Sequence, residues 1–100
     1  MRDSVIAELK VIPLVPSATG VSRYIAAVID VIKKAEGITY QVTPMATIVQ
    51  GPLTRVLQLA QEMHEVPFTM GAVRVLTSIT IDDRRDKYVT MESKVKSVLQ

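Results

Sequence analysis

The chain contains no cysteine, and this absence removes several kinds of chemistry. Without cysteine there is no disulfide framework, no thiolate nucleophile and no thiolate metal site. The sequence also has a single histidine, His64, which cannot build a histidine cluster around a metal ion. We therefore expect neither a metal site nor metal-dependent catalysis in this protein.

The sequence also lacks a dominant charge and a long apolar run. Its 12 basic and 10 acidic residues leave a net charge of +2 with the two signs interspersed, so we expect no nucleic-acid partner. No uncharged apolar stretch approaches the roughly 18–20 residues that span a bilayer. Asp3 precedes the first apolar run and Glu8 lies within it, so this segment does not resemble a signal peptide. Together these absences predict a cytoplasmic protein with no membrane partner.

Apolar side chains, in contrast, are abundant. One hundred residues fit one domain, residues 1–100, and a chain of this length has only a small interior. Hydrophobic residues nevertheless make up 48% of the chain, and the mean hydropathy is +0.26. Because a small monomer cannot hide so many apolar side chains, we expect a homodimer or a homotetramer.

The periodicity of these apolar residues predicts alternating strands and helices. Residues 5–12 place Val5, Ala7, Leu9 and Val11 on one side, which is typical of a strand with one buried face. Apolar spacing and turn residues predict the further elements: a helix over 21–34, short strands over 38–43 and 46–50, a helix from Leu53 to about Pro67, a strand over 73–81 and a helix over 88–99. This order predicts an α+β, ferredoxin-like βαββαβ fold. Its antiparallel sheet carries both main helices on one face, and a C-terminal helix follows.

The other face of the predicted sheet is left without helices. From the pleat, we expect this uncovered face to combine polar and apolar side chains: Glu8, Lys10, Thr47, Arg74, Ser78 and Thr80 with Ile6, Ile12, Val49 and Leu76. Such a mixture is too apolar for free solvent and too polar for a core. It suits contact with a second subunit or with a small ligand.

Five successive charges follow the last predicted strand: Asp82, Asp83, Arg84, Arg85 and Asp86. The two arginines have the geometry to hold a phosphate bidentately. The three aspartates can instead pair with both arginines and help to start the terminal helix. We favour this second interpretation, in which ion pairs hold the terminal helix and a subunit interface together.

Five segments of the chain carry a resemblance to a known family: residues 7–13 (AELKVIP), 22–26 (SRYIA), 44–47 (PMAT), 64–65 (HE) and 81–86 (IDDRRD). Together they resemble the small thiamine-binding, YkoF-like family. The resemblance implies a ferredoxin-like fold, assembly into dimers and tetramers through sheets, and binding of thiamine or its hydroxymethylpyrimidine moiety without catalysis. The chain departs from the family's Met-Gly-Thr and Glu-Gly at two positions, Ala46 and Gln50.

An aminopyrimidine requires a carboxylate or hydroxyl near its ring nitrogen, an acceptor for its amino group and an apolar or aromatic wall. The candidate polar contacts are Glu8, Ser22, Thr43, Thr47 and Ser78, and the candidate walls are Tyr24 and Tyr40. We expect the pocket near the start of the first predicted helix and the strand junction at residues 44–47. No catalytic residues are assigned.

Structural roles would explain several of these candidates equally well. Glu8 can form an ion pair with Lys10 of a neighbouring strand or with Arg74. N-capping by Ser17, Thr19 or Ser22 explains the hydroxyls before the first predicted helix. His64 lies near the end of the second predicted helix, where an imidazole complements the helix C-terminus.

Two functions from different classes therefore remain open. The first is a non-enzymatic binding protein for thiamine or a related pyrimidine, with no other cofactor. The second is a structural or regulatory homo-oligomer that has no dedicated small ligand. An enzyme is the least favoured, because the order of residues contains no recognisable catalytic set or glycine-rich phosphate loop.

Overall fold

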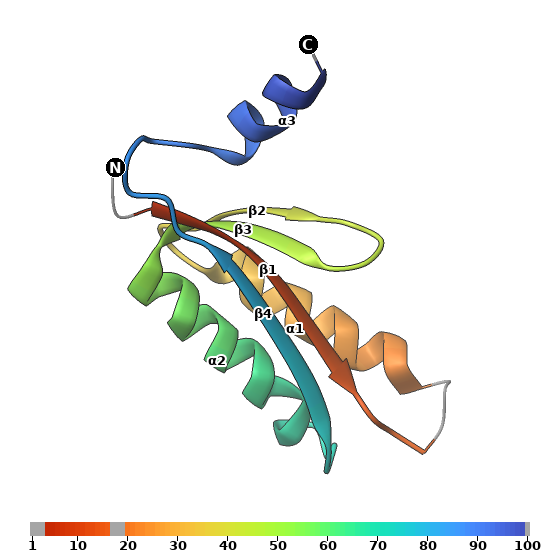
Figure 1. Ribbon diagram of the computed structural model, residues 1–100. Coiled ribbons are helices and arrows are strands. Elements are labelled where there is room, and N and C mark those ends of the chain that lie inside the picture. Colours follow the sequence, from red (N-terminus) through yellow and green to blue (C-terminus); the bar gives the residue numbers. More distant parts are fainter. Residues whose placement is uncertain (1–3, 17–19, 100) are drawn as a thin grey trace.

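The computed structural model describes residues 4–16 and 20–99, and it has the α+β fold that the sequence predicts (Figure 1). The elements are, in order, β1 (Ser4–Pro13), α1 (Val21–Lys34), β2 (Thr39–Val42), β3 (Thr47–Pro52), α2 (Leu53–Thr69), β4 (Val75–Asp82) and α3 (Met91–Leu99). The strands form one antiparallel sheet in the order β2-β3-β1-β4. This order and the two crossover helices confirm the predicted ferredoxin-like arrangement with a C-terminal helix.

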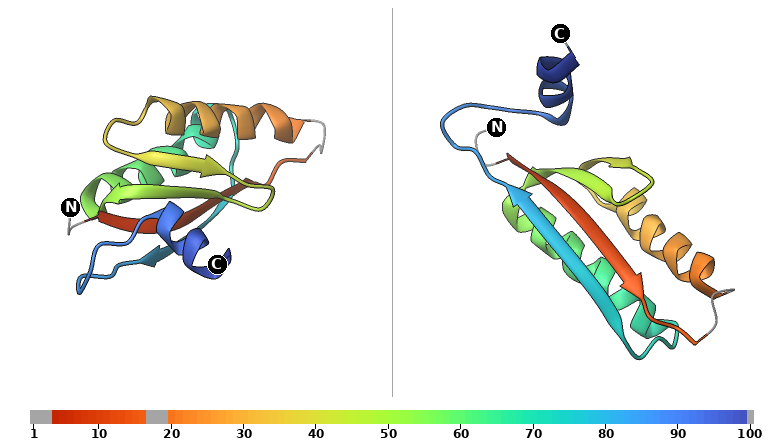
Figure 2. Two further views of the ribbon diagram at one scale, coloured as in Figure 1. Left: turned by 90° about the horizontal axis from the view of Figure 1, so that it is seen from above. Right: turned by 45° about the vertical axis from the view of Figure 1, so that its right-hand side comes forward.

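The two long helices and the short one lie on opposite sides of the sheet. Helices α1 and α2 pack side by side on one face (Figure 1). The segment after β4 then turns over the end of the sheet and brings α3 to the other side, where it stands away from the strands (Figure 2). We call the side under α1 and α2 the covered face, and the side toward α3 the open face.

The hydrophobic core lies between the covered face and the two long helices. β1 contributes Val5, Ala7, Leu9 and Val11, which are all buried, so the predicted alternation of this strand is confirmed. The helices contribute Val28 and Ile32 from α1, and Val56, Leu59, Ala60 and Met63 from α2. Helix formation is therefore stabilised mainly by burial of one amphipathic stripe on each helix.

The helices differ from the sequence-based expectations in detail. Within the predicted second helix, Leu57 is 45% exposed, whereas Leu59 lies in the core. Helix α2 also continues past Pro67 and ends at Thr69. The turn that follows contains Gly71, whose φ of 104° is accessible to glycine without strain. Pro67 lies in the last turn, where the missing N–H removes only one of the final helical hydrogen bonds.

The start of α1 lacks the expected hydroxyl cap. Within the described residues the N-cap is Gly20, and no side chain forms a capping hydrogen bond there. The expected cap by Ser22 is therefore wrong, because Ser22 is already inside the first helical turn and exposed. Ser17 and Thr19 lie outside the described residues.

The register of β3 corrects the predicted composition of the open face. Thr47 pairs with Leu9, and Val49 pairs with Ala7, so both side chains lie on the covered face and are buried. Their predicted place on the uncovered face is wrong by one position, and Ile48 and Gln50 lie there instead. Because side chains alternate along a strand, an offset of one residue moves each of them to the opposite face.

Candidate functional site

A cavity of about 460 Å³ opens between α1 and the hairpin formed by β2 and β3. Its apolar wall comes from Ile25, Val28 and Ile29 of α1, together with buried residues of β1. The hairpin supplies the remaining side through residues 42–47. This is the region in which the sequence analysis expects the ligand pocket, and we call it the hairpin cavity.

Thr43 shapes the hairpin at the edge of this cavity. Its Oγ1 donates a hydrogen bond to the carbonyl of Ala46 over 2.6 Å and accepts one from the N–H of Ala46 over 3.1 Å. The N–H of Thr43 also donates to the Ala46 carbonyl over 2.9 Å. These local bonds hold the turn around Pro44 and Met45 in one shape. Thr43 therefore has a structural role whether or not it contacts a ligand.

Thr47 is the second hydroxyl-bearing residue of the hairpin cavity, whose lining also includes Lys10. It is 5% exposed and lies beside Leu9 and opposite Val42 in the sheet. A hydroxyl in such an apolar wall can fix the orientation of a small ligand, because few competing polar groups surround it. Thr47 and Thr43 are thus the two candidate ligand residues that the structure brings together.

The other candidates lie elsewhere in the described chain. Glu8 and Ser78 are exposed on the open face, where Glu8 pairs with Thr80 and Ser78 pairs with Lys10. Ser22 is exposed at the start of α1 and is absent from the residues that line the hairpin cavity. Tyr40 lines a separate groove below α3. The candidate set therefore divides between two faces of the sheet.

Two further expectations differ from the structure: the ion pair of Glu8 and the place of Tyr24 in the wall of the pocket. No ion pair within 4.0 Å joins Glu8 to Lys10 or Arg74 in the structure. Tyr24, a candidate wall, is buried against α2 and donates a hydrogen bond to the carbonyl of Met70 over 3.4 Å. It contributes to the core and does not line the hairpin cavity.

The charged segment after β4 forms ion pairs within itself. Arg84 bonds Asp86 through two nitrogens, at 2.7 and 3.1 Å, and Arg85 holds Asp83 at 2.7 Å. The hydrogen bond from each arginine lowers the pKa of its aspartate below the usual range. These pairs lie at the surface, so they organise the segment more than they stabilise the fold.

Asp82 reaches a different partner, Lys94 of α3. This ion pair joins the end of β4 to the terminal helix, as the sequence analysis expects for this segment. Whether the same segment contacts a second subunit stays a prediction.

Gln50 is a residue whose role the sequence analysis missed. Its Oε1 accepts a hydrogen bond from the N–H of Met91 over 2.9 Å, and its Nε2 donates to the hydroxyl of Tyr88 over 3.5 Å. The first bond satisfies a free backbone N–H at the start of α3. Gln50 therefore anchors α3 from β3, at the position where the resembled family often has glutamate. The departure from the family pattern at Gln50 was the one sequence feature that pointed to a special role for this residue.

His64 also has a partner that the sequence did not indicate. Its Nδ1 lies 2.7 Å from the Oγ1 of Thr77, so a hydrogen bond joins α2 to β4. The imidazole is half-buried and tilts against Phe68. The position connects two elements of the fold and does not place the ring in the hairpin cavity.

Residues 4–16 and 20–99 contain neither a metal-binding cluster nor a helix that could span a membrane. No cluster of three or more histidine and acidic side chains is arranged to hold a metal ion. No helix in these two segments combines the length and the apolar character needed to cross a membrane.

The sequence and the fold both match known proteins. The sequence model of the family described as thiamine-binding protein matches residues 7–99. The UPF0045 protein YqgV of Bacillus subtilis is 46% identical over 96 residues, which cover 93% of this chain and 92% of that protein. A hypothetical protein from Methanocaldococcus jannaschii has a solved structure that is 34% identical. It matches with a TM-score of 0.86 over 96% of both chains.

A third relative links the fold to thiamine by its description. It is a protein from Thermotoga maritima described as a candidate thiamine biosynthesis or salvage protein, 25% identical, with a TM-score of 0.80. The alignment covers 95% of this chain and 98% of that one. The resemblance found from the sequence is thereby confirmed, and the chain belongs to the thiamine-binding protein family.

Proposed function

We propose that this protein binds thiamine or its hydroxymethylpyrimidine moiety in the hairpin cavity and catalyses no reaction. The observation that carries the proposal is the cavity itself, which combines an apolar wall with the hydroxyls of Thr43 and Thr47. Its volume of about 460 Å³ falls within the range of about 300–1,000 Å³ typical of small-molecule sites. Family membership supports thiamine as the chemical class.

The cavity wall favours the pyrimidine end of thiamine. Apart from the ammonium of Lys10, the described side chains that line it are apolar or carry a hydroxyl, whereas the carboxylate of Glu8 lies on the open face. A cationic thiazolium without a carboxylate partner is costly to bury. The neutral aminopyrimidine would therefore enter the cavity, and the thiazolium would remain in solvent.

Calorimetric titration with thiamine and with hydroxymethylpyrimidine tests this proposal. Thr47→Val keeps the shape of the side chain and removes the hydroxyl, so we expect about tenfold weaker binding of both ligands. Thr80→Val is the matched control, because Thr80 is exposed on the open face, and it should leave the affinity unchanged. Equal affinities of Thr47→Val and the unmodified protein would exclude Thr47 from the site. Absence of binding to either ligand would refute the proposed function.

A second proposal concerns assembly, and the open face carries it. Val98 and Leu99 of α3 are 80% and 79% exposed, and Leu76 of β4 is 49% exposed. Burying apolar side chains of this size against a second copy of the chain is favourable by about 1.5–3 kcal/mol for each side chain fully covered. The protein would then be a homo-oligomer, consistent with its high apolar content.

Sedimentation velocity tests the assembly. Leu76→Asp places a charge on the open face and should shift the protein toward monomer. Leu57→Asp is the matched control, because Leu57 is similarly exposed but belongs to α2 on the opposite side of the sheet. A monomeric unmodified protein at micromolar concentration would refute the proposal, and so would dissociation by Leu57→Asp alone.

A further inference from the structure

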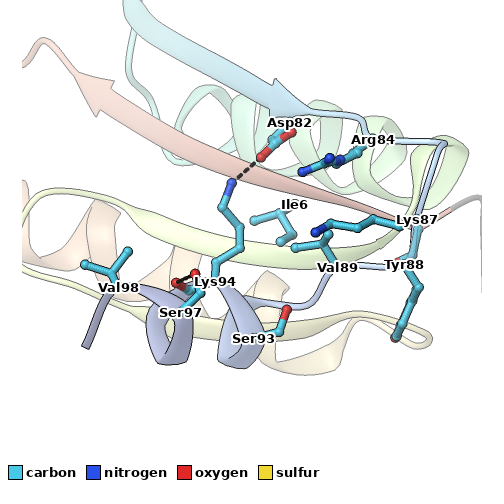
Figure 3. Close-up of a pocket in the computed structure, with 11 residues that line it drawn as sticks. Ile6, Asp82, Arg84, Lys87, Tyr88, Val89, Ser93, Lys94, Ser97 and Val98 are labelled. Atoms are coloured by element: carbon cyan, nitrogen blue, oxygen red, sulfur yellow. Dashed lines mark hydrogen bonds and ion pairs between the residues drawn. The ribbon is translucent and has the colours of Figure 1, made fainter. Parts of the chain in front are cut away.

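A second cavity, of about 520 Å³, lies on the open side between α3 and the ends of β1 and β4 (Figure 3). The segment that connects β4 to α3 closes one side of it. This cavity shares no lining residue with the hairpin cavity, so it is separate from the proposed thiamine site. We call it the α3 cavity.

Basic side chains dominate the charge of the α3 cavity. Arg84 and Lys87 extend into it from the connecting segment, and Lys94 enters from α3 (Figure 3). Among the described residues, Asp82 is the single carboxylate in its lining, and Asp86 pairs with Arg84 from outside the lining. Three cations against these two carboxylates leave one positive charge in excess, which attracts an anionic group.

The cations retain donors beyond those that the ion pairs use. Arg84 spends two of its five N–H groups on Asp86, which holds it from outside the cavity lining. Lys94 has three N–H donors, and its ion pair with Asp82 accounts for one. Lys87 forms no ion pair within 4.0 Å among the described residues. A tetrahedral oxyanion would therefore meet donors from Arg84 and Lys87 of the connecting segment and from Lys94 of α3.

The other lining residues indicate which chemical group could be bonded to the anion. Ser93 and Ser97 already donate their hydroxyl protons to carbonyls of Thr90 and Lys94, so they add no free donor. Ile6 and Val89 form an apolar floor beneath the cationic groups (Figure 3). Such a site accommodates a phosphoryl group bonded to a small apolar or aromatic body.

From these contacts we propose that the α3 cavity binds the phosphoryl group of a small phosphorylated compound, with inorganic phosphate as the minimal ligand. This inference is independent of the proposed thiamine site, which lies on the covered face. Binding would also connect α3 to the segment after β4, because the ligand would contact Lys94 and Lys87 together. Bound phosphate should therefore protect the amides of α3 from hydrogen exchange.

Isothermal titration at low ionic strength with inorganic phosphate and with phenyl phosphate tests the inference. We expect binding of both, with the ester tighter if the apolar floor contributes. Equal affinities would identify phosphate alone as the recognised group, which still supports the site. Lys87→Gln removes one charge-assisted contact and should weaken phosphate binding about tenfold. Lys87→Arg should restore most of it.

Lys96→Gln is the matched control, since Lys96 belongs to the same helix but lines the groove on the side of Tyr40. This variant loses the same charge and should bind phosphate within about twofold of the unmodified protein. Failure of both anions to bind would overturn the inference. Equal weakening by Lys87→Gln and Lys96→Gln would also overturn it, because it would indicate general charge attraction. Thiamine affinity should not change in Lys87→Gln, so the two sites can fail separately.

Discussion

The covered and open faces of the sheet are built from the same strands but have opposite surroundings. On the covered face, Val5, Ala7 and Leu9 are at most 2% exposed. On the open face, Ile12 and Leu76 are 42% and 49% exposed. One half of the alternating side chains therefore forms the interior of the chain, and the other half remains exposed.

The cavities on the two faces differ for the same reason. The hairpin cavity borders the close-packed core, so most of its lining is apolar, and side chains of β1, α1, α2 and the β2–β3 hairpin fix its shape. The α3 cavity is bounded by a helix with no buried residue, which Gln50 and Asp82 hold through polar contacts. Binding of the proposed ligands would therefore depend on shape at the hairpin cavity, and on charge and the position of α3 at the α3 cavity.

The largest expected effect is a difference in the free energy of unfolding between substitutions on the two faces. Ile32 is completely buried under the covered face, so Ile32→Ala should lower the free energy of unfolding by about 2–5 kcal/mol. Ile12→Ala removes the same atoms from the open face and should cost about 1 kcal/mol or less in dilute protein. Urea unfolding measures both variants. Equal losses would contradict the proposed difference between the faces.

The next largest effect should come from Gly51 of β3, which lies close to the backbone of the loop before β2. A Cβ on Gly51 would lie 2.8 Å from the carbonyl oxygen of Gly37 and 2.7 Å from the Cδ1 of Ile38. The carbonyl cannot rotate away alone, so Gly51→Ala should destabilise the protein by about 1–3 kcal/mol. Gly20→Ala has its nearest contact at 4.0 Å and should cost less, about 0.5 kcal/mol, because alanine is a poorer N-cap than glycine. Similar melting temperatures for the two variants would show that the loop before β2 adjusts freely.

Sequence reasoning predicted the fold because strong periodic signals specify it. The alternation in β1 and the apolar spacing in α1 each allow one arrangement, and the element order then leaves few topologies. Short strands carry less information. In β3 the side chains of Thr47 and Val49 were assigned to the wrong face, because a six-residue strand after a turn does not define its own register.

The candidate site was predicted only in part, for a related reason. The region around residues 44–47 does border a cavity, and Thr43 and Thr47 share it. Glu8, Ser78 and Tyr40 lie elsewhere, because residue type alone does not tell which side of a sheet a side chain occupies. The contacts of Gln50 with Met91 and of His64 with Thr77 join elements far apart in sequence, so no local pattern signals them.

A smaller effect should come from the hydrogen bond between α2 and β4 on the covered side. Thr77→Val removes the hydroxyl that lies 2.7 Å from His64 and should cost about 1 kcal/mol in urea unfolding. A double-mutant cycle with His64→Ala should give a coupling free energy of about 0.5–1.5 kcal/mol. Thr80→Val on the open face is the control and should be near neutral. Additive losses in the cycle would mean that this bond does not stabilise the folded chain.

The smallest expected effect lies in the charged segment that follows β4. Hydrogen bonding to Arg85 lowers the pKa of Asp83 in the folded chain below its ordinary value of 3.8. A carboxyl with a lowered folded pKa stabilises the fold above the unfolded pKa and loses that contribution as pH falls through the folded pKa. The melting temperature of Asp83→Asn should therefore lie slightly below that of the unmodified protein at neutral pH. The two should converge in acid, below the folded pKa.

Salt provides the control for this last comparison. Because the Asp83–Arg85 pair lies at the surface, high ionic strength should shrink the difference at neutral pH as well. A difference that persists in both acid and high salt would mean that Asp83 acts through packing. The open side would then resemble the covered face more closely than its exposure indicates, and the segment after β4 would be a rigid wall of the α3 cavity, held in place even when its charges are neutralised.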